Sequence, residues 1–235
     1  MQYSRVYPAR FLNRPNRFVA QVLLEGEAVV VHVKNTGRCR ELLLEGAHVY
    51  LTDGKHDKRK TQYDLIAVEK ERSGQAPLLV NLDAQAPNRV FQEWAASGQF
   101  QSDLTLLRPE QTWGHSRFDF YWEAGSPYNL RRGFVEVKGV TLEENSHARF
   151  PDAPTERGLK HVEELIACRA DGYEAALCFV IQMEGMKQFS PNDNTHPAFG
   201  EALRRAVQAG VQVFARGCIV TPERLELAEP VKLEL

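Results

Sequence analysis

Short apolar runs separated by turn residues mark the first third of the chain. Glu25-Gly26 lies between the first two runs and Thr52-Asp53-Gly54 follows the third, as expected where strands reverse direction. Strands are predicted at residues 17–24, 27–34, 47–52, 63–70 and 77–82. Short strands with no long helix between them are typical of a small closed barrel, and we expect an OB-type barrel, although any small β domain would show the same pattern.

From residue 85 onward the apolar positions follow a different spacing. The run from Pro87 to Ala96 has apolar positions at helical intervals and is followed by Gly98, which predicts a helix. Further helices are predicted at 155–171 and 197–209, and strands at 175–183 and 211–220. Such alternation is typical of an α/β domain with a mixed sheet flanked by helices. We therefore expect a protein of the α+β or α/β class with two domains, an OB-like barrel at 1–84 and a mixed-sheet domain at 85–235.

Two strands joined by a turn are predicted in the middle of the chain, at residues 116–122 and 134–138. The segment 125–129, Gly-Ser-Pro-Tyr-Asn, supplies the turn. Alternation within the first strand predicts that its apolar residues share one face. These residues are Phe118, Phe120 and Trp122.

Polar residues of this strand pair form a candidate metal site. Glu136 and Lys138 share a face of the second strand, so pairing would bring them close to Asp119 on the first. Two carboxylates, with a backbone carbonyl such as that of Val137, suit Mg²⁺, and a lysine beside them can position water and offset negative charge. Glu93, on the preceding helix, is a further candidate ligand. Glu-x-Lys at a strand edge is also common as an ordinary ion pair, so the spacing alone leaves both interpretations open.

The net charge of −2 conceals an uneven distribution of charge. Residues 1–60 carry 11 Lys and Arg against 6 Asp and Glu, whereas the remaining residues carry 18 against 25. Arg14 and Arg17 lie in an opening stretch of twenty residues that contains no acid. A basic amino-terminal part suggests that an anion is bound there, although an unevenly charged, solvated surface would look the same.

A polar loop follows the second predicted strand. Lysine and arginine supply charge for phosphates, asparagine and threonine supply hydrogen bonds, and glycine lets the backbone approach a ligand closely. The same Asn-Thr-Gly sequence is also a good turn. The candidate residues of this loop are Lys34, Asn35, Thr36, Gly37 and Arg38. A second basic run, residues 55–60, is typical of a solvated hairpin tip.

Composition excludes several classes of protein. Hydrophobic residues make up 43% of the chain and charged residues 26%, which is ordinary for a globular protein and excludes general disorder. The four cysteines form no C-x-x-C pair, so a zinc knuckle and a redox motif are excluded, and free thiols in a reducing compartment are expected. The chain start leads into no apolar signal segment, and the longest apolar run, 175–181, is too short for a membrane span. We expect a cytoplasmic protein with no membrane partner.

Several motifs resemble those of a known family. Asp119 with Glu136-Val137-Lys138 looks like the PD-(D/E)xK nuclease motif, with Phe118 where that motif often has proline. A wider set of motifs covers essentially the full length and resembles the bacterial and archaeal sugar fermentation stimulation protein A family. These motifs are His32-x-x-Asn35-Thr36-Gly37, Val80-Asn81, Asn88-Arg89, Ser116-Arg117-Phe118-Asp119, Glu136 to Leu142, Phe150 to Gly158, Lys160-His161 and Phe189-Ser190-Pro191.

The resemblance implies an OB-like domain followed by a PD-(D/E)xK nuclease-like domain, in a protein that binds DNA and regulates sugar (maltose) metabolism. It implies catalytic roles for Asp119, Glu136 and Lys138, and a cation, Mg²⁺ or Mn²⁺, at Asp119 and Glu136, with Glu93 and Glu156 as further candidates. The candidate nucleic-acid contacts are Arg14, Arg17, Lys34, Asn35, Thr36, Gly37, Arg38, Asn81, Asn88 and Arg89.

Three functions follow from these observations. The first is a DNA-binding protein with a nuclease-like Mg²⁺ site, and the second is an active Mg²⁺-dependent nuclease acting on DNA or RNA. The third is a transcription regulator that uses the fold only for binding, against which the lack of a visible helix-turn-helix motif weighs. The oligomeric state is left open, a homodimer included.

Overall fold

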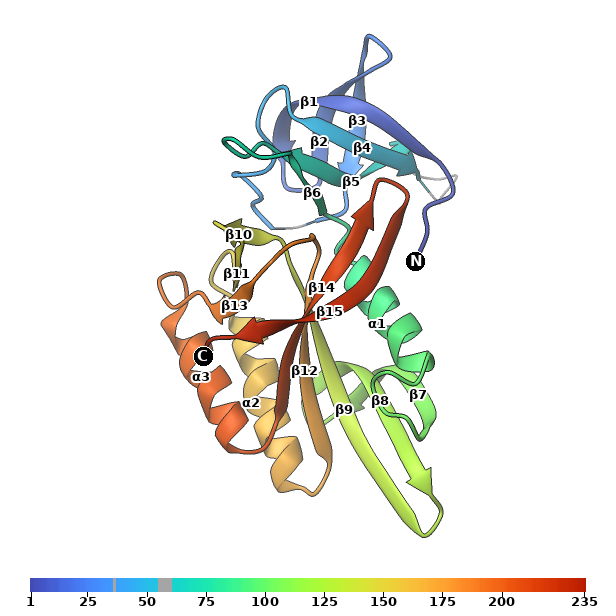
Figure 1. Ribbon diagram of the computed structural model, residues 1–235, viewed down its shortest axis with the longest axis vertical. Helices are drawn as coiled ribbons and strands as arrows, with labels where there is room; N and C mark the ends of the chain where they lie inside the picture. Colours follow the sequence, from blue (N-terminus) through green and yellow to red (C-terminus); the bar gives the residue numbers. More distant parts are fainter. Residues whose placement is uncertain (36, 55–60) are drawn as a thin grey trace.

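The computed structural model describes residues 1–35, 37–54 and 61–235. Two bodies follow each other along the chain, a small all-β body and a larger one that carries the helices (Figure 1). The last strand of the first body ends at Asn81 and the first helix begins at Ala86. Residues 82–85 are therefore the covalent connection between the two bodies.

The N-terminal body is a closed barrel. Its strands are β1 (Val6–Asn16), β2 (Val19–Leu24), β3 (Glu27–Val33), β4 (His48–Asp53), β5 (Tyr63–Lys70) and β6 (Leu78–Asn81). Hydrogen-bonded neighbours run β3-β2-β1-β4-β5, and β3 also pairs with β5 in parallel, which closes a ring of five strands. β6 pairs with β5 outside this ring. The expected five-stranded closed barrel is confirmed, with a different set of strands in the ring.

The hydrophobic pattern does not predict β1, because Pro8 and Pro15 interrupt it. Proline has no N–H to donate, so within sheets it is confined to free edges and irregular positions. Pro8 lies in the half of β1 that pairs with β4 alone, and Pro15 lies where the β1–β2 register shifts. β1 thus takes a place in the ring, and the predicted strand at 77–82 becomes the external strand β6.

The C-terminal body is a mixed sheet of nine strands in the order β10-β11-β13-β15-β14-β12-β9-β8-β7. The central strands β9, β12 and β14 are parallel neighbours, whereas β7, β8 and β9 pair antiparallel. The elements are α1 (Ala86–Ala96), β7 (Leu104–Trp113), β8 (Ser116–Ser126), β9 (Asn129–Val140), β10 (Leu142–Glu144), β11 (His147–Phe150), α2 (Glu156–Ala170), β12 (Glu174–Ile181), β13 (Gln188–Pro191), α3 (Pro197–Gln208), β14 (Gln212–Thr221) and β15 (Arg224–Leu233).

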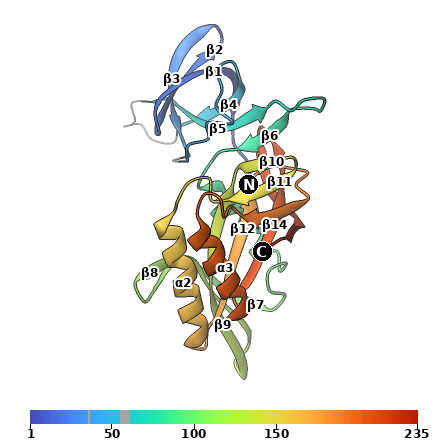
Figure 2. The same ribbon diagram turned by 90° about the vertical axis from the view of Figure 1, so that its left-hand side faces the viewer.

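Helices cover both faces of this sheet, as predicted. α1 packs on one face, where Phe91 contacts Phe120 with ring centroids 5.3 Å apart. α2 and α3 pack side by side on the other face, over a core that includes Phe179 and Leu165 (Figure 2). Apolar residues of β8, β9 and β12 therefore face two separate cores.

Strands β7, β10, β11, β13 and β15 are absent from the prediction. β7 is an edge strand with no buried residue and no apolar alternation, and it contains Pro109 and the positive-φ residue Glu110. β10, β11 and β13 are only three or four residues long. β15 contains Pro230, and Pro230 and the preceding Glu229 are two consecutive exposed positions. These strands form through pairing with neighbours that are distant in sequence, which a local pattern does not reveal.

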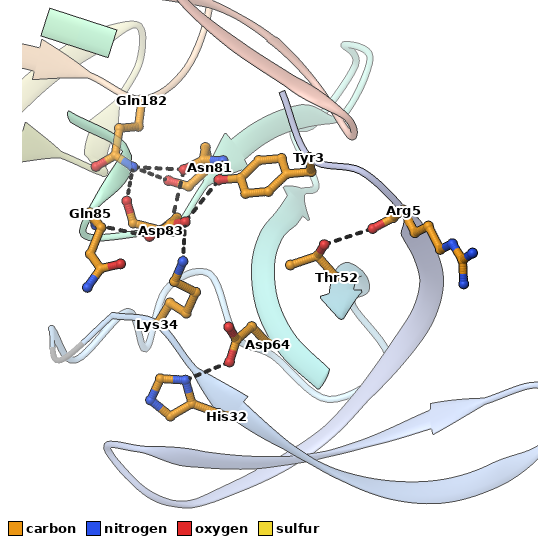
Figure 3. Close-up of polar contacts among 10 residues, drawn as sticks. All are labelled: Tyr3, Arg5, His32, Lys34, Thr52, Asp64, Asn81, Asp83, Gln85 and Gln182. Carbon is orange, nitrogen blue, oxygen red and sulfur yellow. Dashed lines mark hydrogen bonds and ion pairs between the residues drawn. The ribbon is translucent and has the colours of Figure 1, made fainter. Parts of the chain in front are cut away.

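Buried polar contacts join the two bodies (Figure 3). Gln182 follows β12 and is 1% exposed. Its Nε2 donates to the carbonyl and side-chain oxygens of Asn81 at 3.1 and 3.0 Å and to the carbonyl oxygen of Asp83 at 3.1 Å. The Asp83 carboxylate accepts hydrogen bonds from Lys34 Nζ of the barrel at 2.6 Å and from the Tyr3 hydroxyl at 3.2 Å. The connecting segment is therefore fixed to both bodies.

Replacing Gln182 with alanine is expected to lower the free energy of unfolding by about 2–4 kcal/mol, because three buried hydrogen bonds to Asn81 and Asp83 would be lost, each contributing about 0.5–1.5 kcal/mol. Chemical denaturation of the full chain measures the change. Gln208→Ala removes the same amide from an exposed position at the end of α3 and should change stability little. Equal stability of the two variants would contradict the role of Gln182 at the junction.

None of the helices in the described parts of the chain is both long and apolar enough to cross a membrane. All four cysteines are buried and unbridged, in agreement with the expected free thiols. Burial raises the pKa of Cys39 to about 12 and that of Cys168 to about 12. Thiols of this kind are poor nucleophiles at neutral pH, so they contribute to packing.

Candidate metal and nucleic-acid site

Asp119 lies where the pairing between β8 and β9 stops. The last matched residues of this pair are Phe120 and Val135. Beyond them, Oδ2 of Asp119 accepts a hydrogen bond from the backbone N–H of Val137 at 2.7 Å, and Oδ1 accepts one from Nδ2 of Asn88 on α1 at 2.7 Å. The carboxylate therefore takes the place of a backbone acceptor at the end of the ladder, and both of its oxygens are fixed.

The end of the ladder also changes the direction of Phe118. Phe120 and Trp122 belong to the core under α1, whereas Phe118 contacts Phe134 and His161 in the core under α2, with ring centroids 5.5 and 6.1 Å away. The prediction that all three aromatic residues share one face is therefore wrong at Phe118. A regular strand would alternate strictly, and the irregular step at Asp119 breaks that alternation.

Glu136 is held in a buried hydrogen-bond network. It is 3% exposed, and its Oε1 accepts hydrogen bonds from Lys138 Nζ at 2.5 Å and from His161 Nδ1 at 2.5 Å. Its Oε2 is buried and has no hydrogen-bond partner among the described residues. Burial alone would raise the pKa of Glu136, but the hydrogen bond from His161 and the charge of Lys138 hold it below its usual value. Glu136 is thus an ionised carboxylate with one unused oxygen.

The two carboxylates influence each other. Burial and the negative charge of Glu136 raise the pKa of Asp119, against the hydrogen bonds from Val137 and Asn88 that lower it. Neighbouring carboxylates that repel each other are stabilised by a cation between them. Because Glu136 also has an unused buried oxygen, this donor set fits a hard divalent cation.

The donor set is small. The described residues contain no group of three or more His, Cys, Asp and Glu side chains placed to hold a metal ion together. Mg²⁺ is commonly bound by one or two carboxylates and completes its octahedral shell with waters and substrate phosphate oxygens. Asp119 and Glu136 therefore suit a cation that is shared with a phosphate-containing ligand better than a fully enclosed structural ion.

The structure places Glu93 outside this pair of carboxylates. Its side chain is 50% exposed, and it binds the amino group of Met1 at 2.6 Å and Arg89 at 3.5 Å. Asn88 contacts Asp119 instead. Five residues along an α-helix turn the side-chain direction by roughly 140°, so Asn88 and Glu93 cannot face the same site.

α2 brings His161 to the site but leaves Glu156 outside it. His161 is 5% exposed and contacts Glu136 directly. Glu156 is 85% exposed in the first turn of α2, and its Oε1 lies 3.6 Å from Nε2 of His196. The sequence pattern did not single out His161, although it occurs in the Lys160-His161 motif of the resemblance. Only the packing of α2 on β9 shows that its ring reaches the carboxylate.

Arg14 organises the polar loop at residues 35–38. Its guanidinium donates to four carbonyl oxygens at 2.6–2.9 Å, those of Arg17, Asn35, Gly37 and Arg38. The side-chain oxygen of Asn35 accepts a hydrogen bond from the backbone N–H of Gly37 at 2.7 Å, which is the turn that the sequence also allowed. Arg14 therefore shapes the loop from within, and its charge is directed at the backbone.

The other candidate nucleic-acid contacts that the structure describes are either buried at the junction or exposed. Asn81 and Lys34 belong to the buried junction, where their side chains are bonded to protein groups. Arg17, Arg38 and Arg89 are exposed. Thr36 and the basic run 55–60 lie outside the described residues.

These features define a class of protein. A closed barrel is joined through a buried polar junction to a mixed-sheet domain, and that domain holds an Asp-Glu-Lys-His cluster. Residues 12–76 match the model of the SfsA N-terminal OB domain, and residues 85–224 match that of the sugar fermentation stimulation protein RE domain. The chain belongs to the sugar fermentation stimulation protein family, and its expected OB-type barrel is confirmed.

Relatives match over the full length. A sugar fermentation stimulation protein homolog from Desulfitobacterium hafniense is 49% identical over 100% of this chain and 99% of its own length. The homolog from Clostridium perfringens strain SM101 is 48% identical over 100% of both chains. Among solved structures, Pyrococcus furiosus SfsA in complex with Ca²⁺ is similar, with a TM-score of 0.87 and 28% identity over 100% of this chain and 98% of that one.

Proposed function

We propose that this protein binds DNA and holds a divalent cation, Mg²⁺ or Mn²⁺, between Asp119 and Glu136. The observation that carries the proposal is the buried Oε2 of Glu136, which has no hydrogen-bond partner among the described residues. The negative charge of the same carboxylate raises the pKa of Asp119. Carboxylate oxygens are the ligands that these cations prefer. The Ca²⁺ complex of the Pyrococcus furiosus relative supports a divalent cation in this fold.

Exposed groups on the barrel support contact with nucleic acid. The guanidinium of Arg17 lies 4.8 Å from the ring centroid of Phe18, and Phe18 is 46% exposed. An exposed aromatic ring beside a cation can stack on a base while the cation neutralises a phosphate. Arg38, in the loop shaped by Arg14, adds a second exposed charge on this body.

Gel retardation of labelled DNA by the full chain tests DNA binding. Affinity is expected to fall steeply as salt increases, because binding releases counterions from the DNA. The double variant Arg17→Gln/Arg38→Gln should bind more weakly. The slope of log affinity against log salt concentration should be smaller by about one for each phosphate group that the variant no longer neutralises. Arg132→Gln, on β9 near the hairpin turn, is the matched control and should bind like the wild type. Binding that is absent or insensitive to salt would contradict the proposal.

An active nuclease is a second candidate function, favoured by the complete set of Asp119, Glu136 and Lys138. A divalent cation bound there would polarise the phosphate group and lower the pKa of a bound water. Lys138 Nζ lies 2.5 Å from Glu136 Oε1 and is 15% exposed, so it can approach a phosphate and offset charge that develops during hydrolysis. His161 keeps Glu136 oriented through Oε1, which leaves Oε2 for the cation.

Incubation of DNA and of RNA with the protein and Mg²⁺ or Mn²⁺ tests this activity and identifies the substrate. Asp119→Ala and Lys138→Ala are compared with the wild type under the same conditions. Loss of cleavage in both variants would support a nuclease. Cleavage that survives both substitutions would come from a contaminant.

Regulation of sugar (maltose) genes is a further proposal, more specific than DNA binding, and it rests on membership of the family alone. In the described parts of the chain, α1, α2 and α3 each bury one face against the sheet, and none of them projects as a base-reading helix. A footprint at a defined operator would support regulation by sequence-specific binding. Uniform protection along the DNA would contradict it.

A further inference from the structure

A cavity of about 270 Å³ lies between the barrel loop and the mixed-sheet body. Asn35 and Gly37 line it from the barrel, and Gly139 lines it one residue beyond Lys138. Its volume is below the roughly 300–1,000 Å³ of sites for drug-sized ligands, so it suits a single ring system. We propose that this cavity accepts one unpaired nucleobase, with a hydrogen-bonding pattern that selects guanine; this inference rests on the proposed binding of DNA.

Two opposite charges line the cavity. The guanidinium of Arg149 makes no hydrogen bond to another described residue, its Nε is buried without a partner, and the acid that it pairs with, Glu144, lies 3.9 Å away. Asp152 is exposed and forms no ion pair among the described residues. A phosphate would satisfy Arg149 but would be repelled by Asp152. A ligand with both acceptors and donors satisfies both side chains, and nucleobases have such edges.

Guanine matches these two side chains best. Its O6 and N7 are adjacent acceptors, which suit the paired donors of the Arg149 guanidinium. Its N1–H and N2–H₂ are adjacent donors, which suit the two oxygens of the Asp152 carboxylate. Adenine, cytosine and thymine do not present both of these adjacent pairs. A site built from hydrogen-bonding groups rejects analogues that leave those groups unpaired.

The walls of the cavity suit the faces of a base. Leu142, Pro151 and Pro154 supply apolar surface. Bases taken out of a helical stack are commonly held against apolar or aromatic side chains while their edges are read by hydrogen bonds. Single-stranded bases are recognised in the same way.

The barrel side of the cavity is built for close approach. A Cβ atom at Gly37 would lie 2.8 Å from Oδ2 of Asp152 and 2.8 Å from Oδ1 of Asn35. The loop is held in place by Arg14, which bonds the carbonyl oxygens of Asn35 and Gly37. Because glycine has no Cβ atom, the Asp152 carboxylate has room to lie against the loop at the cavity.

The position of the cavity connects it with the carboxylate site. Gly139 follows Lys138 directly on β9, so a base in the cavity would bring its own strand to Lys138 and Glu136. The inference thus assigns a substrate class to the site: a nucleic-acid strand with an unpaired guanine next to the phosphate that the proposed cation at Asp119 and Glu136 would hold.

Single-stranded DNA oligonucleotides that differ only in one central base test this inference. Their affinity for the full-length wild-type protein is measured by fluorescence anisotropy with Ca²⁺ in place of Mg²⁺. The oligonucleotide with guanine should bind about tenfold more tightly than those with adenine, cytosine or thymine. Inosine, which lacks the N2 amino group, and 7-deazaguanine, which lacks the N7 acceptor, should each lose much of this advantage. These comparisons use the wild-type protein, so they do not depend on the folding of a variant.

Arg149→Gln and Asp152→Asn should reduce binding of the guanine oligonucleotide to the level of the other three and leave those three unchanged. Arg132→Gln and Asp171→Asn are matched controls that should keep the preference. A loss in Arg149→Gln that is equal for all four bases would indicate a phosphate contact and overturn base selection. Equal binding of all four bases by the wild type would overturn the inference while leaving DNA binding intact. No binding of any oligonucleotide at low salt would overturn both.

Discussion

Replacing Glu136 with glutamine is expected to abolish measurable binding of divalent cations. The buried carboxylate supplies Oε2, which has no hydrogen-bond partner among the described residues, and the substitution removes its charge without changing its shape. Substitution of groups that merely support a metal ligand costs about 10–100-fold in affinity, so loss of a ligand itself should cost at least about 100-fold. Isothermal titration calorimetry with Mg²⁺, Mn²⁺ and Ca²⁺ measures the change. Asp119→Asn should act in the same direction.

Glu93→Gln is the control for this experiment. It makes the same chemical change at a half-exposed position on α1, where Glu93 binds Met1 and Arg89. Its cation affinity should equal that of the wild type. Unchanged affinity in Glu136→Gln, or a large loss in Glu93→Gln, would place the cation elsewhere. Thermal denaturation without cation shows whether each variant is folded.

Replacing His161 with phenylalanine is expected to weaken cation binding by about 10–100-fold, because His161 orients Glu136, the proposed ligand, through a hydrogen bond. Phenylalanine keeps the ring that packs against Phe118 but cannot donate. Loss of this donor should also lower the free energy of unfolding by about 1–3 kcal/mol. Calorimetric titration and chemical denaturation measure the two effects separately.

The dependence of stability on pH gives a second measure of this role. Because the pKa of Glu136 is lowered in the folded protein, this carboxylate contributes stability above its unfolded pKa, and that contribution is lost as the pH falls through the folded pKa. The His161→Phe variant removes part of the lowering, so its stability should fall at a higher pH than that of the wild type. His147→Phe, which removes contacts to Ser190 and Gln188, is the matched control and should leave cation affinity unchanged. Equal cation affinity in the wild type and His161→Phe would contradict the positioning role.

Much of the fold could be predicted from local patterns. The strands β2 and β3 and the helices α1, α2 and α3 have a buried side and an exposed side, and that asymmetry appears in the sequence as apolar periodicity. β5 is buried continuously from residue 64 to residue 68, and it appears in the sequence as a short run between turn signals. Turn residues predicted the connection between β8 and β9, which is formed by residues 127 and 128. The closed barrel followed from the number and shortness of its strands. The mixed sheet followed from the alternation of strands and helices.

Other elements depend on partners that are remote in sequence. β1 contains two prolines and becomes a strand because β2 and β4 pair with different halves of it. β7 is an edge strand without apolar alternation, and β8 is its pairing partner among the described strands. The direction of Phe118 is set by the end of the β8–β9 ladder. Local propensity contains no information about these pairings.

For the candidate site, the sequence by itself determined the presence of Asp119, Glu136 and Lys138 on two adjacent strands, because the alternation of side chains along a strand is a local property. Only the tertiary structure decided their surroundings. α1 brings Asn88 to Asp119 and turns Glu93 away, and α2 brings His161 to Glu136. Burial and hydrogen bonding then set the charge of each carboxylate and leave one buried oxygen unused. These properties depend on how helices pack on the sheet, which no spacing within a single segment can specify.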